Sequence, residues 1–325
     1  MELLPKHVRF AYTQLNYESK EIRLLKVKQD TEPSNPVEIT IEHIDFGPYV
    51  EAVARRDEEL AEPNDVRPVS DERDEAVPSE VSQMSLEFTA LSYTWGDELP
   101  KSDIIVTSPD SRGWLSVREN LHDFLKLRRQ SESPAFWIDQ ICINQEDDDE
   151  RAQQVNQMWE IYSCATNVEA WLGPRFDGVD EVMDLLAREG QIKPYQRPAP
   201  RFSTSTRQLV AMATSLQYFA DLPYWSRLWV TQEIVLGRSV SMRIGDRKIP
   251  WTTLFWGAER LYLAWQASDH LEKIAYPRLD RSLFNLIQAA QICEIECLVQ
   301  WVWLLPNFGF SPIIRCSRKT FYSYF

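Results

Sequence analysis

Three polar side chains, Asp139, Asn144 and Gln145, follow the apolar run AFWI at residues 135–138. Polar groups just past the end of a buried strand can hold a ligand. In an open parallel sheet, the ligand crevice lies beyond the carboxyl ends of the strands. The same types of side chain also tie a turn to its own backbone. The residues by themselves leave a ligand-facing role and a turn-forming role both open.

A second polar set ends the preceding apolar run, EFTALSYTW at residues 87–95. Ser92, Tyr93 and Trp95 are expected at the same edge of the sheet as Asp139, because parallel neighbours end on one side. Most tryptophans of the chain are better explained as core aromatics than as platforms for a base. Serine hydrolysis is a weak interpretation, because Ser92 has no GxSxG elbow and no histidine falls near these segments.

The acidic run at residues 146–150 predicts the start of a helix rather than a metal site. Anions favour a helix N-terminus, and Asp147 and Glu150 can cap it. A calcium loop would need a central glycine and spaced aspartates, and neither is present. Four scattered histidines and five cysteines without paired spacing give no zinc motif, and the thiols are those expected of a reduced compartment.

Composition excludes several classes of protein. The 325 residues are 44% hydrophobic and carry a formal net charge of −14, so the surface as a whole repels nucleic acid and anionic membranes. The N-terminus has no pattern of a signal peptide. The apolar run at residues 297–310 is shorter than a membrane span and contains Pro306. We therefore expect a cytoplasmic protein that binds neither nucleic acid nor membranes.

Strands and helices alternate along the chain around these residues. An α/β fold with a parallel sheet covered on both faces follows from that alternation. Ser116 and Glu119 form a predicted capping box for the first of the helices. The expected strands are residues 21–27, 87–95, 135–139 and 166–173, and the expected helices between them are 116–129 and 147–164.

The C-terminal part is predicted to add helices and a β-hairpin to this sheet. Helices are expected at 208–220 and 224–236, and the hairpin turns at Gly245 and Asp246. A further helix at 251–266 has Thr252 or Thr253 as its expected cap.

An acidic segment divides the chain near its N-terminus. Residues 57–80 contain ten acids and two bases, with three prolines, and cannot bury enough apolar area to offset the entropy of ordering. We predict four parts: an N-terminal strand region (1–56), a disordered acidic insertion (57–84), the core domain (85–265) and a C-terminal tail (266–325).

Three segments together resemble the fungal heterokaryon-incompatibility (HET) domain. They are FTALSYTWGDE, FWIDQICINQEDDDERAQQVNQMWEIYSCATNVEAWLG and LPYWSRLWVTQEIVLG, in the family's order and spacing. The resemblance covers roughly residues 12–251 and implies a role in non-self recognition, with regulated cell death when incompatible hyphae fuse. Two features depart from the family. Gln140 replaces a small residue, and no DPRDKVYALLGL-like stretch follows, so we interpret the aromatic tail as truncated or misread.

HET domains are also distantly similar to Toll/interleukin-receptor (TIR) domains, which have a flavodoxin-like parallel sheet. The segment SRLWVTQEI resembles the TIR helix whose glutamate, in some members, cleaves NAD at the nicotinamide–ribose bond. Carried over residue by residue, the resemblance implies Glu233 as the catalytic group, with Trp229 one helical turn before it. NAD would be a substrate, and no cofactor is implied. Arg227 or Arg118 could meet its pyrophosphate.

A catalytic Glu233 is chemically reasonable, because nicotinamide leaves as a neutral base and needs no general acid; one carboxylate can stabilise the ribosyl centre. The alternative is a helix carboxylate paired with an arginine or lying at the surface. The chain would then be a non-catalytic module that signals through self-association or protein partners. The sequence leaves enzyme and module both open.

Overall fold

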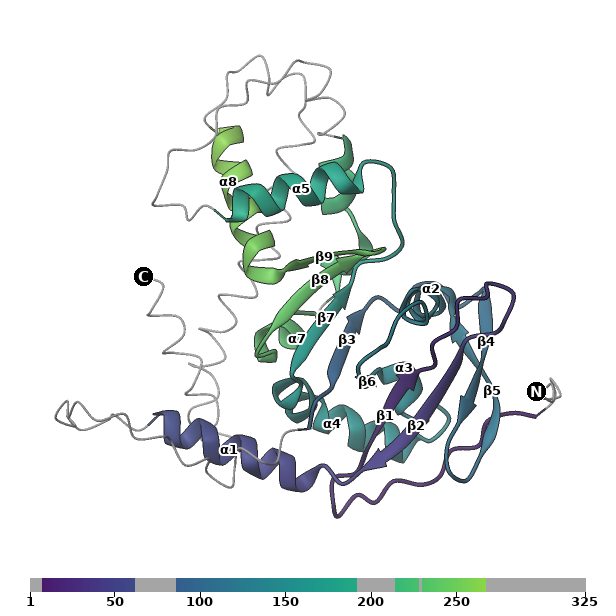
Figure 1. Ribbon diagram of the computed structural model, residues 1–325. Coiled ribbons are helices and arrows are strands. Elements are labelled where there is room, and N and C mark those ends of the chain that lie inside the picture. The colour runs from purple at the N-terminus through teal and green to yellow at the C-terminus, as the bar shows by residue number, and fades with distance from the viewer. Residues whose placement is uncertain (1–7, 62–85, 192–213, 228–229, 267–325) are drawn as a thin grey trace, which may run out of the picture.

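A nine-stranded sheet organises the described part of the chain (Figure 1). The computed structural model describes residues 8–61, 86–191, 214–227 and 230–266. The strand order is β5-β4-β2-β1-β6-β3-β7-β8-β9. The strands are β1 (Ile22–Val27), β2 (Glu38–Ile44), β3 (Thr89–Tyr93), β4 (Lys101–Thr107), β5 (Arg112–Arg118), β6 (Phe136–Trp137), β7 (Asn167–Trp171), β8 (Val240–Ile244) and β9 (Arg247–Pro250).

The sheet is mixed rather than parallel throughout, which corrects the sequence prediction. Its centre, β6-β3-β7-β8, is parallel, and β2 is parallel to β4. The pairs β1–β2, β1–β6, β4–β5 and β8–β9 are antiparallel. The predicted hairpin that turns at Gly245 is the β8–β9 pair. The prediction missed β2, β4 and β5, although β2 alternates buried Ile39 and Ile41 with exposed Thr40 and Glu42, as a half-buried strand should.

Helices cover both faces of the parallel centre, as two neighbouring residues of β6 demonstrate. Successive strand side chains point to opposite faces. Phe136 packs edge-on against Phe124 of α2 (Glu119–Arg128), whereas Trp137 packs against Tyr162 of α4 (Asp148–Cys164). Helices α2 and α4 therefore lie on opposite faces, and the predicted α/β layering is confirmed. Helix α1 (Gly47–Ala61) packs against α4.

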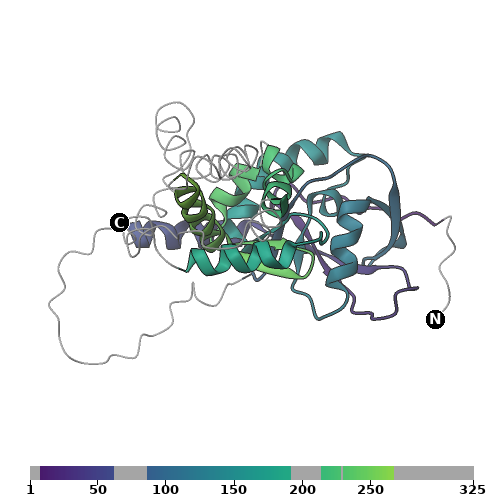
Figure 2. The ribbon, with the colours of Figure 1, turned by 90° about the horizontal axis from the view of Figure 1, so that it is seen from above.

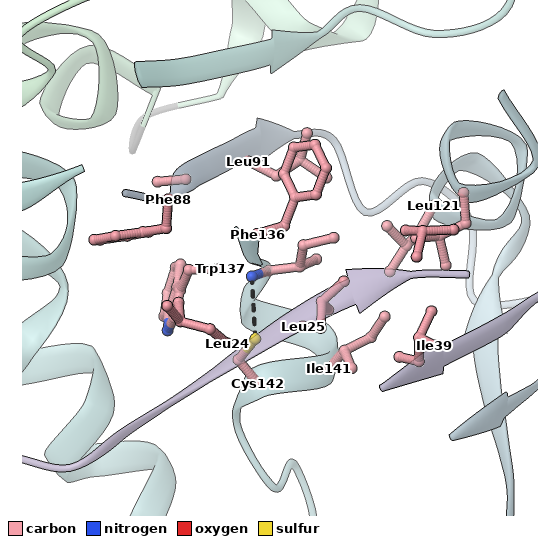
Figure 3. Close-up of a cluster of buried hydrophobic side chains, with 14 of the residues drawn as sticks. Leu24, Leu25, Ile39, Phe88, Leu91, Leu121, Phe136, Trp137, Ile141 and Cys142 are labelled. Carbon is pink, nitrogen blue, oxygen red and sulfur yellow. Dashed lines mark hydrogen bonds between the residues drawn. The ribbon is translucent and has the colours of Figure 1, made fainter. Parts of the chain in front are cut away.

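Figure 3 shows part of the larger hydrophobic cluster, in which Leu25, Phe136 and Trp137 are fully buried. The thiol of Cys142 accepts a hydrogen bond from the backbone N–H of Ile138 at 3.3 Å, and burial raises its pKa to about 12. Cys142 is buried, which fits the expectation that it is an ordinary core residue, and Cys164 is half-buried and packs against the same cluster.

A second hydrophobic cluster lies where α5 (Val179–Gly190) and α8 (Trp251–Gln266) cover β8 and β9. The two helices lie against each other (Figures 1 and 2). Their backbones approach so closely that a Cβ added to Gly257 would lie 2.3 Å from the carbonyl oxygen of Leu186. Within the described residues, no helix combines the length and apolar character that a membrane crossing would require.

The helix starts test several local predictions. Asp147 caps α4 by accepting hydrogen bonds from the backbone N–H groups of Asp149 and Glu150, both at 3.0 Å, so the predicted helix start is confirmed. The capping box at Ser116 is wrong, because Ser116 lies in β5 and its hydroxyl donates to Asp103. Helix α8 begins at Trp251, so Thr252 and Thr253 lie inside the helix rather than at its cap.

Other boundaries also differ from prediction. The strand expected at 135–139 is shorter, because the short helix α3 (Asp139–Cys142) follows β6 directly. The helix expected at 224–236 is a 3-10 turn, η3 (Pro223–Ser226), and a separate helix α7 (Val230–Leu236). Helix α1 includes residues 57–61 of the predicted insertion. The remainder of that insertion and the tail from residue 267 onward lie outside the described residues.

Candidate functional site

The carboxylate of Glu233 lies under the carboxyl end of β3, and the residue is only 3% exposed. Helix α7 presents it to the sheet, where the Ser92 hydroxyl donates a hydrogen bond to its Oε2. The Tyr224 hydroxyl, from η3, lies 2.7 Å from Ser92 Oγ. Because the proton of Ser92 is directed to Glu233, Tyr224 is the donor to Ser92. A buried chain of hydrogen bonds thus runs from Tyr224 through Ser92 to Glu233.

Arg227 is the basic partner of this carboxylate. Its Nη2 lies 3.6 Å from Oε1 of Glu233, and the arginine side chain is 20% exposed. Among the described residues, Arg227 Nη1 is buried and has no hydrogen-bond partner. The guanidinium therefore neutralises Glu233 in part and retains capacity for a further acceptor.

Burial dominates the protonation of Glu233. Desolvation raises its pKa to about 7, and the charge of Asp139 adds to this effect. The Arg227 charge and the hydrogen bond from Ser92 act in the opposite direction. Near neutral pH the carboxyl group therefore changes between its protonated and its ionised form, as a group that does acid–base or charge-stabilising chemistry often does.

Asp139 opens α3 beside this carboxylate and holds Trp95. Its Oδ2 accepts a hydrogen bond from the indole N–H of Trp95 at 2.7 Å, and its Oδ1 accepts one from the backbone N–H of Gln140 at 2.7 Å. Desolvation raises the pKa of Asp139, while the hydrogen bonds from Trp95 and Gln140 and the charge of Arg227 lower it. The structure thus brings Asp139, Trp95, Ser92 and Glu233 to one edge of the sheet.

The indole of Trp95 is fixed on a second side by Arg118. The guanidinium carbon of Arg118 lies 4.9 Å from the Trp95 ring centroid, within cation–π range. Its Nη1 donates to the carbonyl oxygen of Gly96 at 2.8 Å. Gly96 has φ +74°, a conformation that favours glycine, in the loop that follows β3.

Tyr93 points to the opposite side of β3 from Ser92 and lies beside α3. Its hydroxyl donates to Oε1 of Gln140 at 3.4 Å. Burial, followed by the charge of Asp139, raises the pKa of Tyr93 well above its usual value. Tyr93 is therefore a neutral donor at this edge.

Asn144 and Gln145 tie the connection between α3 and α4. The side chain of Asn144 accepts from the backbone N–H of Glu146 at 3.2 Å, and Gln145 Nε2 donates to the carbonyl oxygen of Asp139 at 2.8 Å. These are the contacts of the turn-forming alternative. Trp229, the remaining candidate, lies outside the described residues.

The residues of this edge fall within one stretch that matches a known family. Residues 88–233 match the family model of the heterokaryon incompatibility protein (HET). The matched stretch begins just before β3 and ends at Glu233 itself. The chain carries a HET domain.

A relative agrees with this assignment. The chain is 43% identical over 115 residues to "Heterokaryon incompatibility protein 6, OR allele" of Neurospora crassa. The alignment covers 32% of this chain and 17% of that protein, so the chain spans only a minor part of its relative's length. No solved structure matches the chain.

A buried ion pair that the sequence analysis did not anticipate joins β1 to the HET domain. Arg23 and Glu150 are each 1% exposed and form two contacts, Nη1 to Oε1 at 2.5 Å and Nη2 to Oε2 at 3.0 Å. The remaining N–H groups of Arg23 donate to the carbonyl oxygens of Cys142 and Thr13 and to His43 Nε2. All five donors of the guanidinium are therefore used.

This pair and Tyr224 were missed for different reasons. Arg23 interrupts an otherwise apolar strand, IRLLKV, and a charge in such a strand requires a buried partner. That signal was available. The sequence around Tyr224 does not indicate its role, because the contact with Ser92 joins residues that lie 132 positions apart in the chain.

Proposed function

We propose that this chain takes part in heterokaryon incompatibility and that its HET domain cleaves NAD at the nicotinamide–ribose bond with Glu233. The HET match and the name of the Neurospora relative support the biological role. The observation that carries the chemistry is the position of Glu233, a buried carboxylate hydrogen-bonded to Ser92 at the carboxyl end of β3. Regulated cell death would follow from loss of NAD.

The order of the parallel strands at the centre of the sheet supports a flavodoxin- or TIR-like fold. Numbered in chain order, the strands β6-β3-β7-β8 have the order 2-1-3-4, which is the beginning of the flavodoxin order. The crossover from β3 to β6 carries α2 on one face, and that from β6 to β7 carries α4 on the other. The first crossover leads from β3 to its neighbour on one side, and the second leads to β7 on its other side. Ligands of such sheets bind at this switch point, beyond the carboxyl ends of the strands. Ser92 lies near that end of β3.

The proposed reaction needs one ionised carboxylate. The bond between the nicotinamide nitrogen and ribose C1′ breaks, and the bonding electron pair leaves with nicotinamide, which becomes neutral. The Glu233 carboxylate stabilises the positive charge that develops at C1′. Water then adds to C1′ and releases a proton, which gives ADP-ribose. Since the pKa of Glu233 is about 7, the rate is expected to rise as the pH passes through neutrality.

A non-catalytic module is the second candidate, and one observation favours it. Glu233 is already paired with Arg227 and hydrogen-bonded to Ser92, as a purely structural carboxylate would be. In that case the domain would signal through self-association or through protein partners, and the Glu233 contacts would hold α7 against β3.

Nicotinamide release by the purified full chain separates these candidates. The catalytic proposal requires that wild type consumes NAD and that Glu233→Gln abolishes consumption with the fold retained, as measured by circular dichroism. Glu169→Gln is the matched control, because Glu169 is equally buried at 3% and pairs with Arg243 away from the site. That variant should keep the activity. If wild type releases no nicotinamide while Glu233→Gln still kills hyphae on overexpression, the domain acts as a non-catalytic module.

A further inference from the structure

Within the described part of the chain, the charges at the Glu233 site do not balance. Glu233 and Asp139 are two carboxylates, and Arg227 is the base whose charge acts on both of them. Arg118, a second base at this edge among the described residues, is committed to the Trp95 ring and the carbonyl oxygen of Gly96. With all three side chains ionised, the group formed by Glu233, Asp139 and Arg227 carries one excess negative charge.

The hydroxyl groups around this set do not restore the balance. Burial raises the pKa of Tyr93 and of Tyr162 well above the ordinary value, so both stay neutral. The Ser92 hydroxyl carries no charge either. An excess charge in a buried site is costly, and it can be relieved in two ways: by a proton on one carboxyl group, or by a cation. A ligand with a positively charged ring would supply the cation.

We propose that Asp139 is a specificity-determining residue that makes this site prefer a positively charged pyridinium ring over the neutral dihydropyridine ring of the reduced form. The inference rests on the proposed function for the choice of a nicotinamide ring. Asp139 suits this role because two donors, Trp95 Nε1 and Gln140 N, hold its carboxylate in place, each at 2.7 Å. Its charge acts on the Glu233 carboxyl from a neighbouring position, whereas Glu233 is the group assigned to the reacting atoms.

The matched probes are carba-NAD⁺, whose carbocyclic sugar prevents cleavage, and its reduced form. Both carry the same pyrophosphate and adenosine, so contacts to those groups cancel in the ratio of the two dissociation constants. Calorimetric titration of the full-length wild type should show the cationic form binding at least about tenfold tighter, or ~1.4 kcal/mol. Asp139→Asn should reduce the ratio to about two- or threefold.

Two controls locate the preference in the site. Asp103→Asn removes one charge at the β4–β5 edge, where Asp103 accepts from Ser116, and should leave the ratio unchanged. Raising NaCl from about 0.05 M to about 0.5 M should leave the wild-type ratio within about twofold, because buried charges are screened far less than surface charges. This second measurement needs only wild type, and so it stands even if Asp139→Asn fails to fold.

The outcomes separate the inference from the proposed function. A preference for the cation without NAD cleavage supports the inference and contradicts the proposed function. NAD cleavage with equal binding of the two probes, or with an unchanged ratio in Asp139→Asn, overturns the inference and leaves the proposed function intact. A ratio that collapses in high salt assigns the preference to the diffuse acidic surface and overturns the inference. Absence of binding by both probes overturns both.

Discussion

Ser92 and Glu233 are hydrogen-bonded although 141 positions separate them in the chain. One residue belongs to the first strand of the HET domain and the other ends the matched stretch. The contact therefore closes the domain on itself and places an ionisable group at the carboxyl end of β3. Two properties follow from this arrangement, one of stability and one of acid–base behaviour, and each can be measured.

The first prediction concerns stability as a function of pH. The folded pKa of Glu233 is raised from 4.5 to about 7, so folding favours its protonated form. The stability contributed by that form is fully present below pH 4.5 and is lost as the pH rises through about 7. The loss amounts to about 3 kcal/mol. Urea unfolding of wild type and Glu233→Gln at several pH values should show their difference changing by this amount. If the difference in unfolding free energy does not vary with pH, the pKa of Glu233 is not raised in the folded state.

The second prediction concerns Ser92. Its hydrogen bond favours the ionised form of Glu233, so Ser92→Ala should raise the pKa of Glu233 further. A hydrogen bond to a charged group corresponds to a shift of about one pH unit. The midpoint of the pH–stability difference, or of the NAD-cleavage profile, should move upward by that amount. Ser226→Ala is the control, because that hydroxyl donates to the carbonyl oxygen of Pro223 at the surface. A midpoint that stays in place would show that Ser92 does not act on Glu233.

The edge of the sheet was predictable from sequence, since it depends on a local rule. Parallel strands that follow one another through helices end on the same side, so apolar runs that finish on Ser92 and on Asp139 must bring these residues near each other. The burial of Glu233 was predictable in part from its apolar neighbours on a helical stripe. The hydrogen bond that joins Glu233 to Ser92, and the approach of Tyr224, depend on how α7 and η3 dock. No spacing in the sequence encodes that docking.

The antiparallel flanks were missed because their signals are short and compete with helix signals. Ser116, with Glu119 three residues later, has the form of a capping box, yet cross-strand pairing with β4 extends β5 to Arg118. Tertiary pairing overrode a local pattern. The ion pair of Arg23 and Glu150 illustrates the opposite case. Glu150 ends a run of acids that indicates a solvent-exposed helix start. Its buried partner, Arg23, lies 127 positions away in the chain.

The third prediction concerns the contact of α5 with α8. Gly257→Ala would place a Cβ 2.3 Å from the carbonyl oxygen of Leu186, and backbone cannot yield as a flexible side chain does. Overpacking of this kind costs about 1–3 kcal/mol in the free energy of unfolding. Leu263→Ala on the same helix is the control, because Leu263 is 45% exposed and should change stability by less than about 0.5 kcal/mol. Equal urea midpoints for the two variants would contradict the close approach.

The fourth prediction concerns the buried pair of Arg23 and Glu150. Each residue is only 1% exposed, so removal of one partner leaves the other charge buried without a counter-charge. This costs about 3–5 kcal/mol in the free energy of unfolding. Arg23→Met and Glu150→Met should each be destabilised to this extent in urea unfolding. The double variant removes both charges together, so its cost should fall short of the sum of the single costs by about 2 kcal/mol or more.

Lys28→Met and Glu38→Met form the control cycle. Their pair is also close, at 2.7 Å, but the lysine side chain is 53% exposed, and its coupling should stay below about 1 kcal/mol. Additive costs at Arg23 and Glu150 would mean that the two side chains do not stabilise each other, and that β1 is held to the HET domain by its apolar contacts instead.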